Sequence, residues 1–113
     1  MKTPPHLTRS EFNEILTRLT TGLSEFLGEQ LADVYLYGSY ARGDAYDGSD
    51  IDILIVIDGE FDYFELMDKT SDLSWGLSLE NDIVISRVFV SKTEFNDRNS
   101  PFLMNVHQEA IPV

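Results

Sequence analysis

The first half of the chain carries one helical pattern of apolar positions followed by two strand patterns. Apolar residues recur every three or four positions over residues 10–27, which predicts a helix that Ser10 caps and Gly28 ends. Residues 33–37 (DVYLY) form a short β-branched and aromatic run that predicts a strand. Residues 51–57 predict a second strand, and its nearly continuous apolar run indicates burial on both faces at the centre of a sheet.

The second half predicts two more helices and a longer strand. A helical pattern runs from about residue 61 to Trp75 and is expected to end at Gly76. Residues 82–90 (DIVISRVFV) predict the third strand, after which Ser91 is placed to cap a helical turn. A last helix is predicted over residues 101–109, with a proline at its first position.

These elements indicate one α/β (α+β) domain over residues 1–113, because no repeat or Pro/Gly-rich linker divides the chain. Residues 1–9 are expected to be a flexible lead-in, since Pro4 and Pro5 oppose regular structure. The chain has no cysteine, which excludes a disulfide framework and a thiolate zinc site. No apolar run approaches the roughly 20 residues that span a bilayer, and the start resembles no signal peptide, so a cytoplasmic location is expected.

The net charge of the chain narrows the classes of molecule that it could bind. The chain has 20 acidic and 8 basic side chains, a net charge of -12. Such a chain repels phosphate backbones, which argues against an extended nucleic-acid interface. It would attract a basic protein, or divalent cations where carboxylates gather, although acidity can also serve solubility alone.

Two aspartates stand at the start of the central predicted strand. Asp50 and Asp52 point the same way because side chains alternate along a strand. Two carboxylates on the same face of a strand and only two positions apart raise each other's pKa unless a cation lies between them. Oxygen ligands on a rigid strand suit Mg²⁺ or Mn²⁺. Water molecules and substrate phosphates would complete the coordination of such an ion.

The turn before these aspartates supplies groups that bind phosphate. Gly38 lets the backbone approach a ligand, and Ser39 begins a predicted helical turn whose N–H groups favour anions. Arg42, one turn later, can reach a triphosphate. Together with the aspartates these residues predict a nucleoside-triphosphate site, the alternative being a solvated loop whose Gly and Asp residues serve turn geometry.

The stretch GSYARGDAYDGSDID, residues 38–52, resembles the signature of the DNA polymerase β-like nucleotidyltransferases, in which Gly-Ser precedes Asp-x-Asp. In a chain this short it is most similar to the minimal nucleotidyltransferases, antitoxins encoded beside HEPN-domain toxins. The resemblance implies a small mixed β-sheet flanked by helices. It also implies that Gly38 and Ser39 hold the nucleotide phosphates and that Asp50 and Asp52 bind metal.

The same resemblance implies a third carboxylate on a later strand. Asp82 is favoured because it directly precedes an apolar run, as Asp50 precedes its own; Glu80, one alternation earlier, is the rival. By resemblance Asp82 would bind the metal ion that activates the acceptor hydroxyl and could take its proton.

The function implied is a Mg²⁺-dependent transfer of AMP from ATP to a hydroxyl, expected to be a tyrosine, of a HEPN-domain ribonuclease toxin. Two Mg²⁺ ions are expected, and Mn²⁺ is an alternative. Two other functions stay open: an acidic antitoxin that acts by binding alone, and nucleotide transfer to a small hydroxylated molecule such as an aminoglycoside.

Several aromatic residues lie near these motifs. Tyr35 and Tyr37 share one strand face, which indicates packing, and Trp75 is expected to contact the core or a partner. Tyr40 and Tyr46 flank the predicted site, so either could stack on a nucleotide base or lie on the loop surface.

Overall fold

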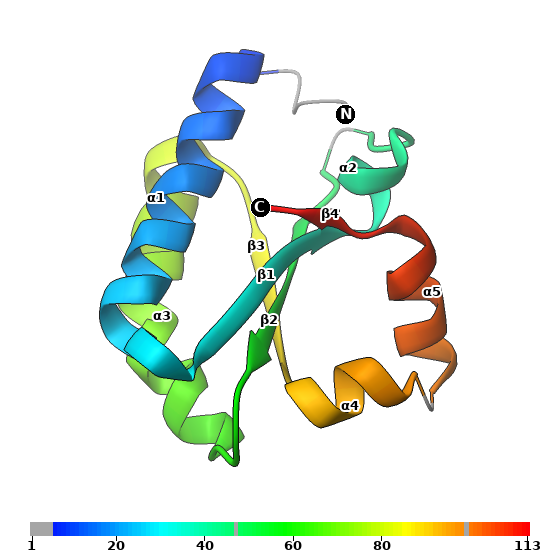
Figure 1. Ribbon diagram of the computed structural model, residues 1–113. Helices are drawn as coiled ribbons and strands as arrows, with labels where there is room; N and C mark the ends of the chain where they lie inside the picture. The colour runs from blue at the N-terminus through cyan, green and yellow to red at the C-terminus, as the bar shows by residue number, and fades with distance from the viewer. Residues whose placement is uncertain (1–5, 47, 99) are drawn as a thin grey trace.

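The computed structural model describes residues 6–46, 48–98 and 100–113 (Figure 1). In chain order the elements are α1 (Arg9–Leu27), the 3-10 turn η1 (Gly28–Gln30), β1 (Leu31–Tyr37), α2 (Ser39–Arg42), β2 (Ile51–Ile57), α3 (Tyr63–Asn81), β3 (Ile85–Ser91), α4 (Lys92–Asp97), α5 (Pro101–Glu109) and β4 (Ile111–Pro112). Within the described ranges no helix has both the length and the apolar character needed to cross a membrane.

The strands form one mixed sheet in the order β3-β2-β1-β4. β1 pairs antiparallel with β2 and β4, whereas β2 and β3 run parallel and are joined through α3. β2 therefore lies between two strands, and all of its residues except Asp52 are buried. The predicted small mixed sheet flanked by helices, with residues 51–57 at its centre, is confirmed.

Helices cover both faces of the sheet, α1 and α3 on one side and α4 and α5 on the other (Figure 1). Alternation along β2 divides its side chains between two apolar clusters. The isoleucines at 51, 53, 55 and 57 pack with α1 and α3, while Leu54 and Val56 pack with α4 and α5. Asp52 has the parity of Leu54, so its side chain lies on the α5 face of the sheet.

The start of the chain differs slightly from the prediction. Of the predicted lead-in over residues 1–9, residues 1–5 lie outside the described part, and α1 begins at Arg9. Thr8, not Ser10, caps this helix: its hydroxyl accepts the N–H of Glu11 at 3.0 Å, and the Glu11 carboxylate accepts the N–H of Thr8 at 2.9 Å. β1 also begins two residues earlier than predicted, at Leu31.

The boundary between α3 and β3 was predicted wrongly. The helix continues through Gly76 to Asn81, and the strand begins at Ile85 instead of residue 82. Gly76 costs an interior helix position about 1 kcal/mol, but Leu77 beyond it is buried, and this packing extends the helix. Asp82 then ends α3 in a left-handed conformation, with φ 49° and ψ 55°.

The C-terminal elements confirm two predictions and include a strand that the sequence did not suggest. Ser91 caps α4 as predicted, and α5 has the predicted bounds. The two-residue strand β4 was not predicted; it pairs with β1 at Tyr35 and Leu36. This pairing brings the end of α5 to the same end of the sheet as the Gly38 turn.

Candidate functional site

A cavity of about 500 Å³ opens where β1 ends, β2 begins and α5 passes over the sheet. Gly38, Ser39, Arg42, Asp50 and Asp52 all line it. The structure therefore brings together five of the six predicted site residues, and we call this cavity the nucleotide pocket.

The Gly38 turn fits against Asp52. Gly38 has φ 75° and ψ -156°, a conformation essentially restricted to glycine. A Cβ atom there would lie 2.2 Å from Oδ2 of Asp52, because Tyr37 and Asp52 are directly paired across β1 and β2. Ser39 then begins the short helix α2, as predicted, and lines the pocket.

Asp52 is in an environment that disfavours its charge. The carboxyl group is partly buried, and this burial raises its pKa; the charge of Asp50 raises it further, and Arg42 opposes the shift. A carboxylate with a raised pKa beside a second carboxylate is stabilised by a cation. Asp50 and Asp52 are therefore the residues here that could hold a divalent metal ion, with water and phosphate oxygens completing its coordination.

Arg42 is held between two carboxylates. Its Nε donates to Oδ2 of Asp44 at 3.1 Å, and its Nη1 donates to Oε2 of Glu109 at 2.7 Å. The hydrogen bonds to Asp44 and to Glu109 raise the pKa of the guanidinium. Arg42 thus stays charged and is fixed at the rim of the pocket.

Glu109, the last residue of α5, was missed by the sequence analysis. Its side chain is largely buried and lines the pocket together with Phe102, Asn105 and Val106 of the same helix. It lies 67 positions from Arg42 in the sequence. No local pattern signals such a contact, which depends on β4 turning the chain back along β1.

Asp82, the predicted third carboxylate, is not part of this pocket. It lines a different cavity beside α3, and the premise that it begins the third strand is wrong. Ser86 is the β3 residue paired with Asp52. Glu80, the rival, forms an ion pair with Arg18 at 2.8 Å. Among the described residues, no three acidic, histidine or cysteine side chains form a cluster suited to a metal ion.

The aromatic predictions had mixed outcomes. Tyr40 is buried in the core against Phe12, with ring centroids 5.5 Å apart, so it cannot stack on a base. Tyr46 is 74% exposed and lines the pocket.

The packing predicted for Tyr35 and Tyr37 is confirmed, because their rings contact Phe95 and Phe102. Burial, and next the charge of Asp52, raise the pKa of Tyr37 to about 12. Trp75 is largely exposed, which rules out a core position and leaves the predicted partner contact untested.

The family model of the nucleotidyltransferase domain matches residues 16–111. The chain belongs to this family. The nucleotidyltransferase is 42% identical over 81 residues to MJ0604 of Methanocaldococcus jannaschii, a protein named as a candidate protein adenylyltransferase. The match covers 71% of this chain and 75% of MJ0604.

Solved structures share the fold of this nucleotidyltransferase, the polymerase β-like fold. A candidate nucleotidyltransferase from Sulfolobus solfataricus has a TM-score of 0.54 at 27% identity, over 89% of this chain and 74% of its own. A structure of the toxin–antitoxin MntA–HpeT has a TM-score of 0.54 at 20% identity, over 90% of this chain and 70% of its own. A toxin–antitoxin structure with AMP-PNP has a TM-score of 0.55 at 20% identity, over 85% of this chain and 69% of its own.

Proposed function

We propose that this nucleotidyltransferase is an antitoxin that transfers AMP from Mg²⁺-bound ATP to a tyrosine hydroxyl of a HEPN-domain ribonuclease toxin. The observation that carries the proposal is the convergence of the Gly38–Ser39 turn, Arg42 and the Asp50–Asp52 pair in one pocket. Membership of the nucleotidyltransferase family supports nucleotide transfer, and the name of MJ0604 supports a protein acceptor.

One side of the pocket would receive the triphosphate. The absent side chain at Gly38 lets phosphate oxygens approach the backbone, and the Ser39 hydroxyl can donate to them. Arg42 lies at the rim with its position set by Asp44 and Glu109, and its charge offsets that of the phosphates. These groups act by positioning and by charge compensation, which are the main contributions of protein side chains to such transfers.

The other side would hold Mg²⁺ between Asp50 and Asp52. When bound, the ion supplies charge neutralisation at the phosphates and lowers the pKa of the attacking hydroxyl. The acceptor oxygen forms a bond to the α-phosphorus, the bond to the bridging oxygen breaks, and pyrophosphate leaves. The hydroxyl proton passes to solvent. The role of Asp82 at the acceptor stays a prediction, since its side chain lines the neighbouring cavity.

A tyrosine of the toxin is proposed as acceptor because AMP adds bulk and negative charge. Placed beside a ribonuclease active site, that charge opposes the RNA phosphates and blocks the toxin. A protein of this fold occurs in the toxin–antitoxin pair MntA–HpeT, which supports a role of this kind for the chain.

One observation favours a second function, neutralisation by binding alone. Among the described residues, no third acidic side chain joins Asp50 and Asp52 in a cluster suited to a metal ion, and Glu109 of the same pocket pairs with Arg42, so the two aspartates could be a structural remnant. The net charge of -12 would then provide the attraction to a basic toxin.

The two functions are separated by one labelling experiment. The chain is incubated with α-labelled ATP, Mg²⁺ and a HEPN-domain protein of the same organism, and label in that protein is followed on a gel. The Asp50→Asn, Asp52→Asn double variant is expected to lose at least a hundredfold in labelling.

The matched control for this variant is Asp33→Asn with Asp58→Asn, which removes two exposed charges outside the pocket and should label normally. Toxin neutralisation that persists in the pocket variant without labelling would establish the binding function instead. Label found only in a small molecule would favour an aminoglycoside-type acceptor.

A further inference from the structure

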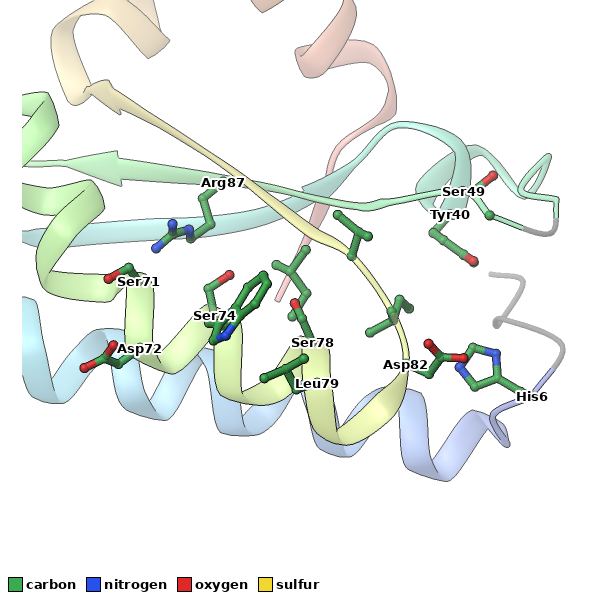
Figure 2. A pocket seen from close by; sticks show the side chains of 15 residues that line it. His6, Tyr40, Ser49, Ser71, Asp72, Ser74, Ser78, Leu79, Asp82 and Arg87 are labelled. Carbon is green, nitrogen blue, oxygen red and sulfur yellow. The ribbon is translucent and has the colours of Figure 1, made fainter.

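A second cavity, of about 620 Å³, lies between α3 and β3 (Figure 2). β3 is an edge strand, so among the described residues no further strand pairs with this edge of the sheet. We call the cavity the α3–β3 groove; Ser71, Ser74, Trp75, Leu79, Val84 and Arg87 line its walls. None of these residues has a part in the transfer described above.

The groove presents apolar side chains to solvent. Trp75 is 66% exposed and Leu79 is 65% exposed, and both line the groove from α3. Large apolar side chains gathered beside a hollow mark sites of protein contact. Tryptophan and arginine in particular are enriched among the residues that dominate interface energies.

Arg87 adds a charge to this apolar surface. Its guanidinium is half-buried and donates to the hydroxyl of Thr70 and, at 3.4 Å, to the carbonyl of Met67. Burial lowers its pKa. The ion pairs found among the described residues belong to Arg18 and Arg42, and none involves Arg87. In a chain with 20 acidic side chains, an arginine without a carboxylate partner is set up to receive one from another molecule.

The groove continues into the nucleotide pocket. Gly48 and Ser49 line both cavities, and Asp50 follows them directly. A protein seated in the groove would therefore lie beside the end of the pocket at which the metal-binding aspartates are found. A phosphate-rich partner is disfavoured there, because Asp72 and Asp82 also line the groove.

We propose that the α3–β3 groove seats the acceptor protein of the transfer reaction. An apolar segment of the acceptor packs on Trp75 and Leu79, a carboxylate of the acceptor pairs with Arg87, and its target hydroxyl reaches the nucleotide pocket past Ser49. This inference rests on the proposed function, since it assumes that the acceptor is a protein.

The single tryptophan makes the docking directly observable. The chain is labelled with 5-fluorotryptophan, so that its ¹⁹F spectrum reports Trp75 alone, and the unlabelled HEPN-domain protein is added stepwise. We expect a saturable shift of the resonance. In parallel, Trp75→Ala and Leu79→Ala should each raise the KM for the acceptor about tenfold or more, with ATP affinity unchanged.

Phe64→Ala is the matched control, because Phe64 lies on the same helix, is 84% exposed and does not line the groove. It should leave the KM for the acceptor unchanged. The proposal would be overturned if the acceptor were modified while the Trp75 resonance did not move and the Trp75 variant kept an unchanged KM for the acceptor. A resonance that shifts with the chain's own concentration alone would overturn it too, since the occupant would be a second copy.

Failure of the proposed function has a different signature. If the acceptor shifts the Trp75 resonance but receives no AMP, the result supports the docking surface and contradicts the proposed enzymatic activity. Neither shift nor transfer contradicts both proposals.

Discussion

Asp52 lies so close to Gly38 that the turn between β1 and α2 has no room for a side chain. The turn that could admit phosphate and the carboxylate that could hold metal are therefore parts of one contact. Any residue larger than glycine must move one of them.

Gly38→Ala should both destabilise the fold and abolish transfer. The backbone conformation of Gly38 costs another residue about 1–3 kcal/mol, and the new methyl group would displace the Asp52 carboxylate. Urea denaturation measures the first effect, and labelling of the acceptor measures the second.

The displacement of Asp52 can be separated from backbone strain by a double variant. In an Asp52→Ala background the methyl group meets no carboxylate, so the stability cost of Gly38→Ala should fall by the part that the carboxylate clash contributes. Gly28→Ala is a control for strain, since Gly28 has φ 54° and nothing within 4 Å of the added methyl. Equal costs of Gly38→Ala in both backgrounds would contradict the proposed contact.

At the scale of elements, α3 shows where packing overrides a local signal. The sequence pattern predicts a helix end at Gly76, yet the helix continues for five more residues because Leu77 is buried against the core. The position has no positive φ and no neighbour within 4 Å of an added Cβ.

Gly76→Ala should therefore stabilise the protein, by about 0.5–1 kcal/mol, since alanine favours the helix and restricts the unfolded chain. Thermal or urea denaturation measures the gain. Gly59→Ala is the matched control: its surroundings are equally open, but its φ of 93° makes the same substitution destabilising. A loss of stability in Gly76→Ala would show that the helix needs glycine there.

Elements with an unbroken pattern were predictable, and junctions were less so. The apolar run of β2 and the proline-led pattern of α5 define their own bounds. The end of α3 depends on tertiary burial, and the strand β4 is too short to carry a pattern. The wrong start of β3 at Asp82 followed from this; the predicted role of Asp82 was argued from that boundary and stays a prediction.

The same limit applies to the candidate site. Gly38, Ser39, Arg42, Asp50 and Asp52 lie within one stretch of sequence, so a local signature can find them. Glu109 comes from the opposite end of the chain, and only the path of α5 and β4 brings it there.

For the whole molecule, the excess of acidic residues works against the folded state. A net charge of -12 in a chain of 113 residues creates self-repulsion that the compact state increases. The basic side chains that form ion pairs among the described residues are two arginines, so local pairing compensates little of it.

The Tm should therefore rise as NaCl increases from about 20 mM to about 500 mM, because the shorter Debye length weakens this repulsion. A variant with Glu29→Gln, Asp33→Asn and Asp58→Asn removes exposed charges outside both cavities and should show a shallower rise. Parallel slopes for the two proteins in differential scanning calorimetry would assign the effect of salt to something other than charge.

The ion pair between Arg42 and Glu109 has a thermodynamic consequence for the last helix. A triphosphate that attracts Arg42 competes with Glu109, so binding at one end of the pocket changes how firmly α5 is held at the other. Linkage makes this coupling reciprocal: whatever loosens α5 changes nucleotide affinity by the same factor. A protein that contacts α5 could in this way set the ATP affinity of the nucleotidyltransferase without touching the nucleotide.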